Sequence, residues 1–426
     1  KEALDKGARR PALPDESVQK LGVVGAGMMG AGIAHVAAMA GIAVVLVDAT
    51  VEAAERGKAH SAGLLDKAIQ RGTGTEESKT AVLARITATT DYAALAGCDL
   101  VIEAVFENMD VKKEVFGKLD AVCKAGAILA TNTSYLDVDE IAAATSRPAD
   151  VIGLHFFSPA HVMKLLEIVI ADQTASDVVA TGFALGKALG KISVRAGVCD
   201  GFIGNRILAV YRTAADHMVL DGATPYQIDK ALTDFGFAMG PFAVADLAGL
   251  DIGWMTRKRK APDRHPDERV PTYIDKLCEQ GPFGQQTGEG YYVYEKGQRA
   301  SMPNPKIPVL IAAEQEKLKI TPREFSDEEI VSRYMCAMVN ESAKVVEEGI
   351  ARRPADVDMV LLFGYGFPRY RGGPLKWADL QGLDTVLADI ERFAAEDAWF
   401  WQPSTLLKTL VADGRNFDDL NRAGAK

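Results

Sequence analysis

The feature that most constrains this chain is the stretch over residues 21–48. An apolar run stops at Gly25, and Gly27 and Gly30 follow at the spacing G-x-G-x-x-G. An Ala-rich run typical of a helix comes next, and a second apolar run ends at Asp48. A strand, a tight turn, a helix, a strand and an acid in this order form the dinucleotide-binding βαβ pattern.

Each residue of this pattern has a physical role in holding a nucleotide. Gly25 permits the turn, Gly27 lets the backbone approach a pyrophosphate, and Gly30 lets the helix pack against the strand. The free N–H groups at the start of the helix face the phosphates. Asp48 accepts hydrogen bonds from the adenosine ribose and repels a ribose phosphate, which predicts NAD rather than NADP as the cofactor. A glycine turn without a ligand is the weaker alternative, because the surrounding pattern is complete.

Length, charge and cysteine usage exclude several classes of protein. The 426 residues are enough for two or three domains, and the net charge of −10 argues against a nucleic-acid partner. The sequence contains no apolar span long enough for a membrane helix, no signal-peptide core and no C-terminal peroxisomal tripeptide. We therefore expect a cytoplasmic, bacterial protein without a membrane partner. The five cysteines are scattered without a C-x-x-C, which predicts no disulfide framework and no metal site.

Strands and helices alternate along residues 18–197, which predicts a doubly wound α/β sheet of mainly parallel strands. Ligands of such sheets bind at the carboxyl ends of the strands. Glu107, Asn132 and Ser134 each follow a predicted strand and are therefore candidate site residues. The polar residues 1–17 are interpreted as a linker.

Two apolar runs, 151–157 and 164–170, differ from this alternation because only a short connection joins them. That connection is too short for a parallel crossover and predicts an antiparallel pair. The register that closes it places His155 opposite Glu167, about 5 Å apart at the β carbons. A surface ion pair is the alternative, but the apolar neighbours of both residues favour a partly buried pair.

The composition becomes helical after the sheet. We expect a first helical domain over residues 198–300, with long helices at 200–220 and 242–257. A linker at 301–325 and a second helical domain at 326–426 follow.

The second helical domain repeats the first. The matching pairs are Gly240-Pro241 with Gly373-Pro374 and Asp246-Leu247 with Asp379-Leu380. Asn205 corresponds to Tyr334, so polar chemistry at Asn205 was not duplicated. A duplicated unit can pack against its twin as two subunits pack across a two-fold axis, which predicts a monomer with an internal pseudo-dimer.

With these residues in view, the chain resembles the L-3-hydroxyacyl-CoA dehydrogenase family. The motifs that carry the resemblance are GAGMMGAGIAH, EAVFEN, NTSYL, HFFSP followed by KLLEIV, and GFIGNR. It resembles in particular the dehydrogenase part of the bacterial and peroxisomal multifunctional β-oxidation enzymes, in which an enoyl-CoA hydratase domain comes first. The resemblance implies a Rossmann-type sheet followed by two related helical domains, NAD as cofactor and an acyl-CoA as substrate. It also implies that the chain is a fragment of a longer enzyme.

The resemblance also assigns roles to residues of this sequence. His155 would be the general base and Glu167 its orienting partner, while Ser134 and Asn205 would hold the substrate oxygens. The residues implied to bind NAD are Gly25, Gly27, Met28, Met29, Gly30, Asp48, Ala104, Val105, Glu107, Lys112, Asn132, Ser134 and Ser158. At Ser158 the family usually has Asn, which puts the contacts of that position in question.

Further candidates come from spacing. Lys67 and Arg71 lie one helical turn apart and are candidates for the CoA phosphates. Tyr365, in the second repeat, is a candidate substrate contact. Among the other histidines, we expect His35 to be structural and His161 to be exposed.

Two other functions compete with this interpretation. A 6-phosphogluconate-type dehydrogenase also joins a nucleotide domain to a helical domain, but it relies on a lysine base and needs no His–Glu hairpin. A protein that binds NAD without turnover is the second alternative, and the presence of His155, Glu167, Ser134 and Asn205 argues against it.

Overall fold

The structure is a computed structural model that describes residues 18–295 and 301–423, so the expected linker at 1–17 lies outside the described residues. The chain divides into two compact units. The first holds the residues up to Arg206 together with Glu348–Tyr365 and the residues from Asn421, and the second holds Ile207–Glu347 and Gly366–Leu420. The chain therefore leaves the first unit, builds most of the second, and returns to the first.

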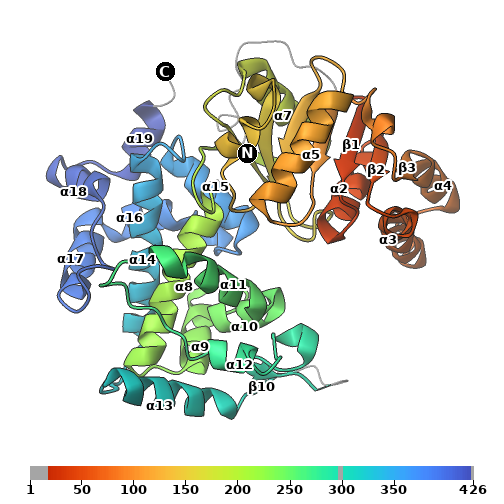
Figure 1. Cartoon of the computed structure of the whole chain (residues 1–426). Helices are drawn as coiled ribbons and strands as arrows, with labels where there is room; N and C mark the ends of the chain where they lie inside the picture. The colour runs from red at the N-terminus through yellow and green to blue at the C-terminus, as the bar shows by residue number, and fades with distance from the viewer. Residues whose placement is uncertain (1–17, 296–300, 424–426) are drawn as a thin grey trace. The chain divides into compact units, whose positions relative to one another are not determined.

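The first unit contains an eight-stranded sheet with the order β3-β2-β1-β4-β5-β6-β7-β8 (Figure 1). The strands are β1 (Lys20–Val24), β2 (Ala43–Val47), β3 (Ile86–Thr89), β4 (Leu100–Glu103), β5 (Ile128–Thr131), β6 (Val151–Phe156), β7 (Leu165–Val169) and β8 (Ile192–Ala196). Neighbouring strands run parallel except β6 and β7, which are antiparallel. This confirms the predicted doubly wound sheet.

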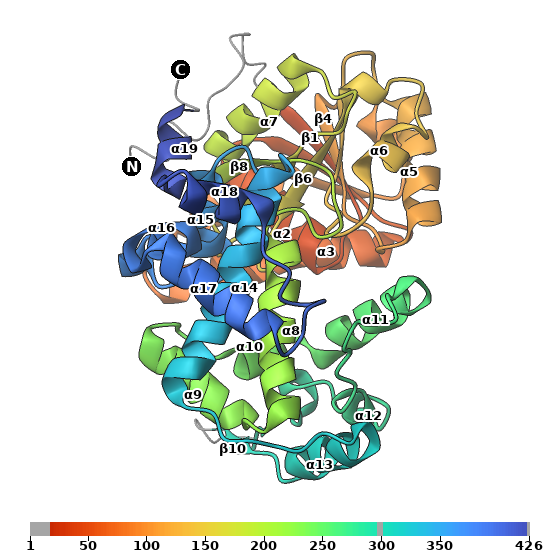
Figure 2. The same cartoon turned by 90° about the vertical axis from the view of Figure 1, so that its left-hand side faces the viewer.

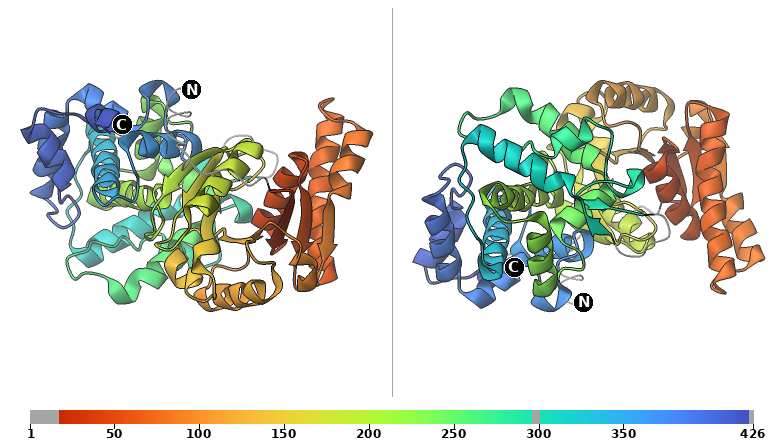
Figure 3. Two further views of the ribbon diagram at one scale, coloured as in Figure 1. Left: turned by 90° about the horizontal axis from the view of Figure 1, so that it is seen from above. Right: turned by 90° about the horizontal axis from the view of Figure 1, so that it is seen from below.

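Helices cover both faces of this sheet. The helices of the first unit are α2 (Met28–Met39), α3 (Val51–Gln70), α4 (Glu76–Ala84), α5 (Met109–Val122), α6 (Val138–Ala142), α7 (Ser176–Ala188) and α15 (Pro354–Gly364). Helices α2 and α7 share one apolar core with the strands, and Figure 2 shows α7 and α5 on opposite sides of the sheet. Helices α3 and α4 pack beside β2 and β3 at one edge (Figure 3).

Helix α15 belongs by sequence to the second repeat, yet it packs on β7 and β8 of the first unit. Its last residue, Gly364, lies so close to Leu165 that an added β carbon would come within 2.5 Å of the leucine side chain. Residue Ala351, just before α15, forms a bridge with Ala196 at the end of β8. The sheet is thus completed by a segment that follows it by more than 150 residues.

The antiparallel pair confirms the predicted register. His155 lies opposite Glu167, with Leu154 opposite Ile168 on one side and Phe156 opposite Leu166 on the other. Short connections fix the register of a hairpin, which is why sequence spacing was sufficient here.

The second unit is helical. Its helices are α9 (Pro225–Phe235), α10 (Pro241–Ala248), α11 (Leu250–Lys260), α12 (Asp275–Cys278), α13 (Lys306–Leu318), α14 (Asp327–Glu347), α16 (Pro374–Gln381), α17 (Leu383–Ala394) and α18 (Thr405–Ala412). Helices α8 (Gly204–Asp221) and α19 (Phe417–Ala423) begin or end in the first unit, and short strands β9 (Tyr292–Val293) and β10 (Met302–Pro303) pair with each other.

The predicted helix over 200–220 begins at Gly204 instead. The predicted helix over 242–257 is two helices, because Gly249 between them adopts a φ of +108°, which favours glycine. The segment expected as a linker at 301–325 contains α13, whose buried Ile307 and Ile311 have the four-residue spacing of an amphipathic helix.

In each of the two repeats an aspartate holds two successive backbone N–H groups. Asp246 accepts from Tyr291 and Tyr292, each at 2.9 Å, and Asp379 accepts from Phe417 and Asp418, each at 2.9 Å. The sequence repeat is therefore also a repeat of hydrogen-bonding pattern.

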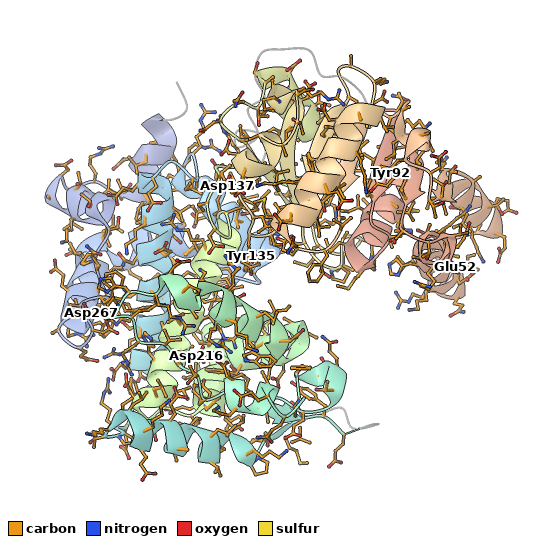
Figure 4. All side chains as sticks on the ribbon, viewed as in Figure 1. Glu52, Tyr92, Tyr135, Asp137, Asp216 and Asp267 are labelled. Atoms are coloured by element: carbon orange, nitrogen blue, oxygen red, sulfur yellow. The ribbon has the colours of Figure 1, made fainter. Side chains whose placement is uncertain are left out.

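A second buried aspartate of this unit, Asp216 (labelled in Figure 4), accepts a hydrogen bond of 2.6 Å from Tyr273.

No helix within residues 18–295 and 301–423 is long and apolar enough to cross a membrane.

Candidate active site

The glycine turn after β1 leaves an open space in front of α2. A β carbon on Gly25, which has a φ of +96°, would lie 2.5 Å from the carbonyl oxygen of Ala104. One on Gly30 would lie 1.8 Å from the carbonyl oxygen of Gly25. One on Gly27 would meet nothing within 4 Å. The protein itself therefore does not require glycine at Gly27, and the free space at the helix start suits a pyrophosphate.

The residues predicted around this turn lie beside it. The Asp48 carboxylate follows β2 and accepts a 2.6 Å hydrogen bond from the backbone N–H of Ala26 within the turn. Met28 begins α2 with its side chain 69% exposed, and its sulfur lies 3.8 Å from the Ser158 hydroxyl. The turn after β6 that contains Ser158 thus reaches the start of α2.

We expect Gly27→Ala to weaken NAD binding by about tenfold or more, equivalent to about 1.4 kcal/mol, because the methyl group occupies the space that the pyrophosphate needs. Thermal stability should not fall, since the methyl group meets no protein atom. Titration calorimetry with NAD measures the affinity. Gly63→Ala is the matched control, because Gly63 on α3 also has open space around it. Unchanged affinity in Gly27→Ala would contradict the predicted position of the cofactor.

An ion-pair network lies at the end of β4, and its centre is the buried pair of Lys112 and Glu103. Lys112 on α5 is 1% exposed, and its ammonium group lies 2.7 Å from the Glu103 carboxylate and 3.3 Å from that of Glu107. Glu103 also accepts hydrogen bonds from the Thr131 hydroxyl and the backbone N–H of Val105, both at 2.7 Å. Lys112, predicted to bind the cofactor, is thus held by the buried carboxylate of Glu103 and the exposed carboxylate of Glu107.

Glu107 connects this network to the predicted substrate contact Ser134. One Glu107 oxygen accepts from the Thr133 hydroxyl at 2.6 Å and from the backbone N–H of Ser134 at 2.8 Å. The neighbouring Asn132 accepts a 2.9 Å bond from the backbone N–H of Phe156, one residue after His155. Hydrogen bonds therefore connect the ends of β4, β5 and β6, where Glu107, Asn132 and Ser134 lie.

His155 and Glu167 form a buried pair. The Nδ1 atom of His155 lies 2.7 Å from a carboxylate oxygen of Glu167, and the two residues are 3% and 0% exposed. The surface ion pair considered as the alternative is therefore wrong. The aromatic rings of Phe157 and Phe202 lie 4.4 and 5.6 Å from the imidazole, centroid to centroid. Glu167 thus binds Nδ1, and Nε2 is the other ring nitrogen that can exchange a proton.

The second oxygen of Glu167 binds the start of α8. It accepts a 3.0 Å hydrogen bond from the backbone N–H of Gly204, the residue before Asn205. The Asn205 side chain in turn accepts a 2.8 Å bond from the hydroxyl of Tyr365. The predicted residues His155, Glu167, Asn205 and Tyr365 thus form one connected group within the first unit.

The predicted phosphate contacts are not part of this group. Lys67 lies in the last turn of α3 and Arg71 caps its C-terminus, and both are exposed. Lys67 instead adds positive charge near His161, and burial together with His60, Lys191 and Lys67 lowers the pKa of that imidazole.

Three histidines that sequence reasoning left separate lie close together. The ring of His161 lies 6.1 Å from the rings of both His35 and His60, centroid to centroid. His161 is exposed, as predicted, and His35 is buried. Burial, assisted by the other two imidazoles, lowers the pKa of His35 from 6.5 to about 4, and its buried Nδ1 has no hydrogen-bond partner.

We expect His35 to make folding stability fall as the pH drops from 6.5 to about 4. The unfolded chain binds a proton near pH 6.5, whereas the folded chain does not do so until about pH 4, so protons favour the unfolded state in this window. His35→Gln should flatten this part of the profile in urea unfolding series at several pH values. His265→Gln, at an exposed histidine that stacks on Trp399, is the control and should keep the wild-type slope. A wild-type slope in His35→Gln would contradict the expectation.

Sequence reasoning missed several residues that support the site. Glu103 could have been found, because a lone acid inside the apolar run DLVIEA indicates a buried partner. The contacts of Gly204 with Glu167 and of Tyr365 with Asn205 join segments far apart in the chain, so no local sequence pattern predicts them.

Comparison with known proteins identifies the class. Two family models match the chain: the 3-hydroxyacyl-CoA dehydrogenase NAD binding domain over residues 20–199, and the C-terminal domain of the same family over 201–294 and again over 330–422. The fold and the site define an NAD-binding oxidoreductase with a helical C-terminal region. The second C-terminal match confirms the predicted repeat. The chain belongs to the 3-hydroxyacyl-CoA dehydrogenase family, as its motifs indicated.

Curated relatives are longer than this chain. It is 42% identical over 425 residues to a peroxisomal bifunctional enzyme of Danio rerio, and 35% identical over 421 residues to a fatty acid oxidation complex subunit alpha of Psychrobacter arcticus. The matches cover 96% and 97% of this chain and 58% of each relative.

Solved structures match nearly the whole chain. A 3-hydroxybutyryl-CoA dehydrogenase from Escherichia coli has a TM-score of 0.82 at 28% identity, with 93% of this chain and 99% of that one covered. The dehydrogenase part of multifunctional enzyme 1 from C. elegans has a TM-score of 0.69 at 27% identity, with 96% and 95% covered.

Proposed function

We propose that this chain oxidises a (3S)-3-hydroxyacyl-CoA to the 3-ketoacyl-CoA with NAD in fatty-acid β-oxidation. The observation that carries the proposal is the buried hydrogen bond between His155 and Glu167, next to strand ends that also hold Ser134. Family membership and the relatives' names support the choice of substrate.

His155 acts as the general base. Bound NAD supplies the acceptor for the hydride that leaves the substrate carbon. Nε2 of His155 takes the hydroxyl proton, for which a neutral imidazole is suited near pH 7. Glu167 fixes the ring so that Nδ1 carries its proton, and its negative charge stabilises the imidazolium that forms.

Polar donors hold the substrate oxygens. Ser134 and Asn205 donate hydrogen bonds to the substrate hydroxyl and the thioester carbonyl, and polarise the ketone in the reverse direction. Lys67 and Arg71 serve the CoA phosphates. The residues proposed to hold NAD are Gly25, Gly27, Met28, Met29, Gly30, Asp48, Ala104, Val105, Glu107, Lys112, Asn132, Ser134 and Ser158.

The test is consumption of NADH in the presence of acetoacetyl-CoA, followed by absorbance. Wild type should turn over, and His155→Gln should lower kcat by about a hundredfold to ten-thousandfold while NAD affinity stays unchanged. His265→Gln is the control and should keep full activity. Absence of NADH consumption by folded wild type would reject the dehydrogenase, and activity retained in His155→Gln would place the base elsewhere.

We also propose that the chain is the dehydrogenase part of a longer enzyme with a preceding enoyl-CoA hydratase domain. The chain spans 58% of the length of the relatives named above, which is the support for this proposal. The coding sequence upstream of residue 1 tests it.

The second helical repeat supports a monomeric state for this chain. It supplies within one chain the copy that a dimer would supply between two. We expect light scattering to give a mass near 45.7 kDa, with and without NAD. A stable dimer would contradict this.

A further inference from the structure

The two helical repeats differ at the positions that meet near His155. Asn205 is the second residue of α8, in the first repeat. The residue after α15 is Tyr365, whereas the residue after the matching helix α9 is Gly236. The second repeat therefore has a tyrosine side chain at a position where the first has a glycine.

These two side chains come together in the first unit. The Tyr365 hydroxyl donates a 2.8 Å hydrogen bond to Oδ1 of Asn205. The Tyr365 ring meets the ring of Phe157 edge to face, with centroids 5.6 Å apart, and Phe157 in turn lies 4.4 Å from the His155 imidazole. Tyr365 thus contacts the site through an amide on one side and an aromatic ring on the other.

The start of α8 is shaped to receive Tyr365. A β carbon on Gly204 would lie 2.2 to 2.5 Å from atoms of the Tyr365 ring and hydroxyl, so a larger residue there would displace the tyrosine. The backbone N–H of the same Gly204 donates to Glu167, the partner of His155. The first turn of α8 therefore contacts Tyr365, carries Asn205 and binds Glu167, the partner of His155.

The direction of the hydrogen bond matters because a carboxamide has two unlike ends. Its oxygen only accepts hydrogen bonds and its NH2 group only donates them. With Oδ1 engaged by the tyrosine hydroxyl, the NH2 group of Asn205 is the end left for a substrate oxygen. In the reverse orientation the amide oxygen would face the substrate and could not donate to a carbonyl oxygen.

We propose that Tyr365 is a positioning residue that orients the Asn205 carboxamide, so that its NH2 group faces the oxygen of the substrate. The inference rests on the proposed function. No proton or electron passes through Tyr365. Both repeats accordingly contribute to the substrate site. The first repeat supplies the hydrogen-bond donor, the Asn205 amide, and the second supplies the Tyr365 hydroxyl that orients it.

A double-mutant cycle with Tyr365→Phe and Asn205→Ala tests the proposal. Tyr365→Phe keeps the ring that packs on Gly204 and Phe157 and removes only the hydroxyl. It should lower kcat/KM by about tenfold, the loss of one hydrogen bond of about 1.4 kcal/mol. In the Asn205→Ala background the same change should have almost no further effect, because the amide it orients is absent. The pH profile should keep its shape, because the base pair is untouched.

Tyr370→Phe is the matched control. Its hydroxyl donates to the backbone oxygen of Phe235 in the second unit, so removing it should leave kcat/KM unchanged. Wild-type activity in Tyr365→Phe would overturn the proposal. So would an equal loss in both backgrounds, since Tyr365 would then act independently of Asn205.

A measurement without turnover separates this inference from the proposed function. In protein labelled with 15N at asparagine, the side-chain resonances of Asn205 are assigned by their absence in Asn205→Ala. Tyr365→Phe should shift and broaden them, because the carboxamide becomes free to flip, while Tyr370→Phe should not. Unchanged resonances in Tyr365→Phe would overturn the inference even if turnover is normal. An inactive wild type with the expected shifts would reject only the dehydrogenase.

Discussion

The buried carboxylate of Glu167 is the group on which the rest of the site depends. Its two oxygens bind the His155 imidazole at 2.7 Å and the backbone N–H of Gly204 at 3.0 Å. A fully buried carboxylate that loses such partners costs several kcal/mol, so β6, β7 and the start of α8 are held in one arrangement. A negative charge at the first turn of α8 is also favoured by the helix dipole. One side chain thereby sets the orientation of the base and the position of the helix that carries Asn205.

The parts of the structure that sequence predicted are those governed by neighbours in the chain. The glycine turn could be predicted because a β carbon at Gly25 or Gly30 would clash with a neighbouring backbone carbonyl oxygen. The pairing of His155 with Glu167 follows from a short connection between two strands, because a hairpin leaves little freedom of register. Glu107 and Ser134 follow from the rule that polar residues at strand ends meet at one edge of the sheet.

The parts that sequence did not predict depend on contacts between distant segments. The bond from Gly204 to Glu167 joins residues 37 apart, and the bond from Tyr365 to Asn205 joins residues 160 apart. No local pattern encodes such distances. Other misses were local. Gly249, which breaks the predicted helix with a φ of +108°, and the apolar spacing in α13 are both visible in the sequence, but a prediction based on composition did not use them. The resemblance to a family supplied roles for residues, but it gave no account of what holds them in place.

The return of Glu348–Tyr365 to the first unit has a consequence for the order in which the chain is made. β8 is the last strand in the order of the sheet, and its end is bridged by Ala351, while Gly197 donates a 2.8 Å bond to the carbonyl oxygen of Ile350. During synthesis the ribosome must therefore deliver most of the second unit before this strand is covered. A nascent sheet with an open edge is a template for pairing between chains, so the edge at β8 is exposed to such pairing in the interval before residue 351 emerges.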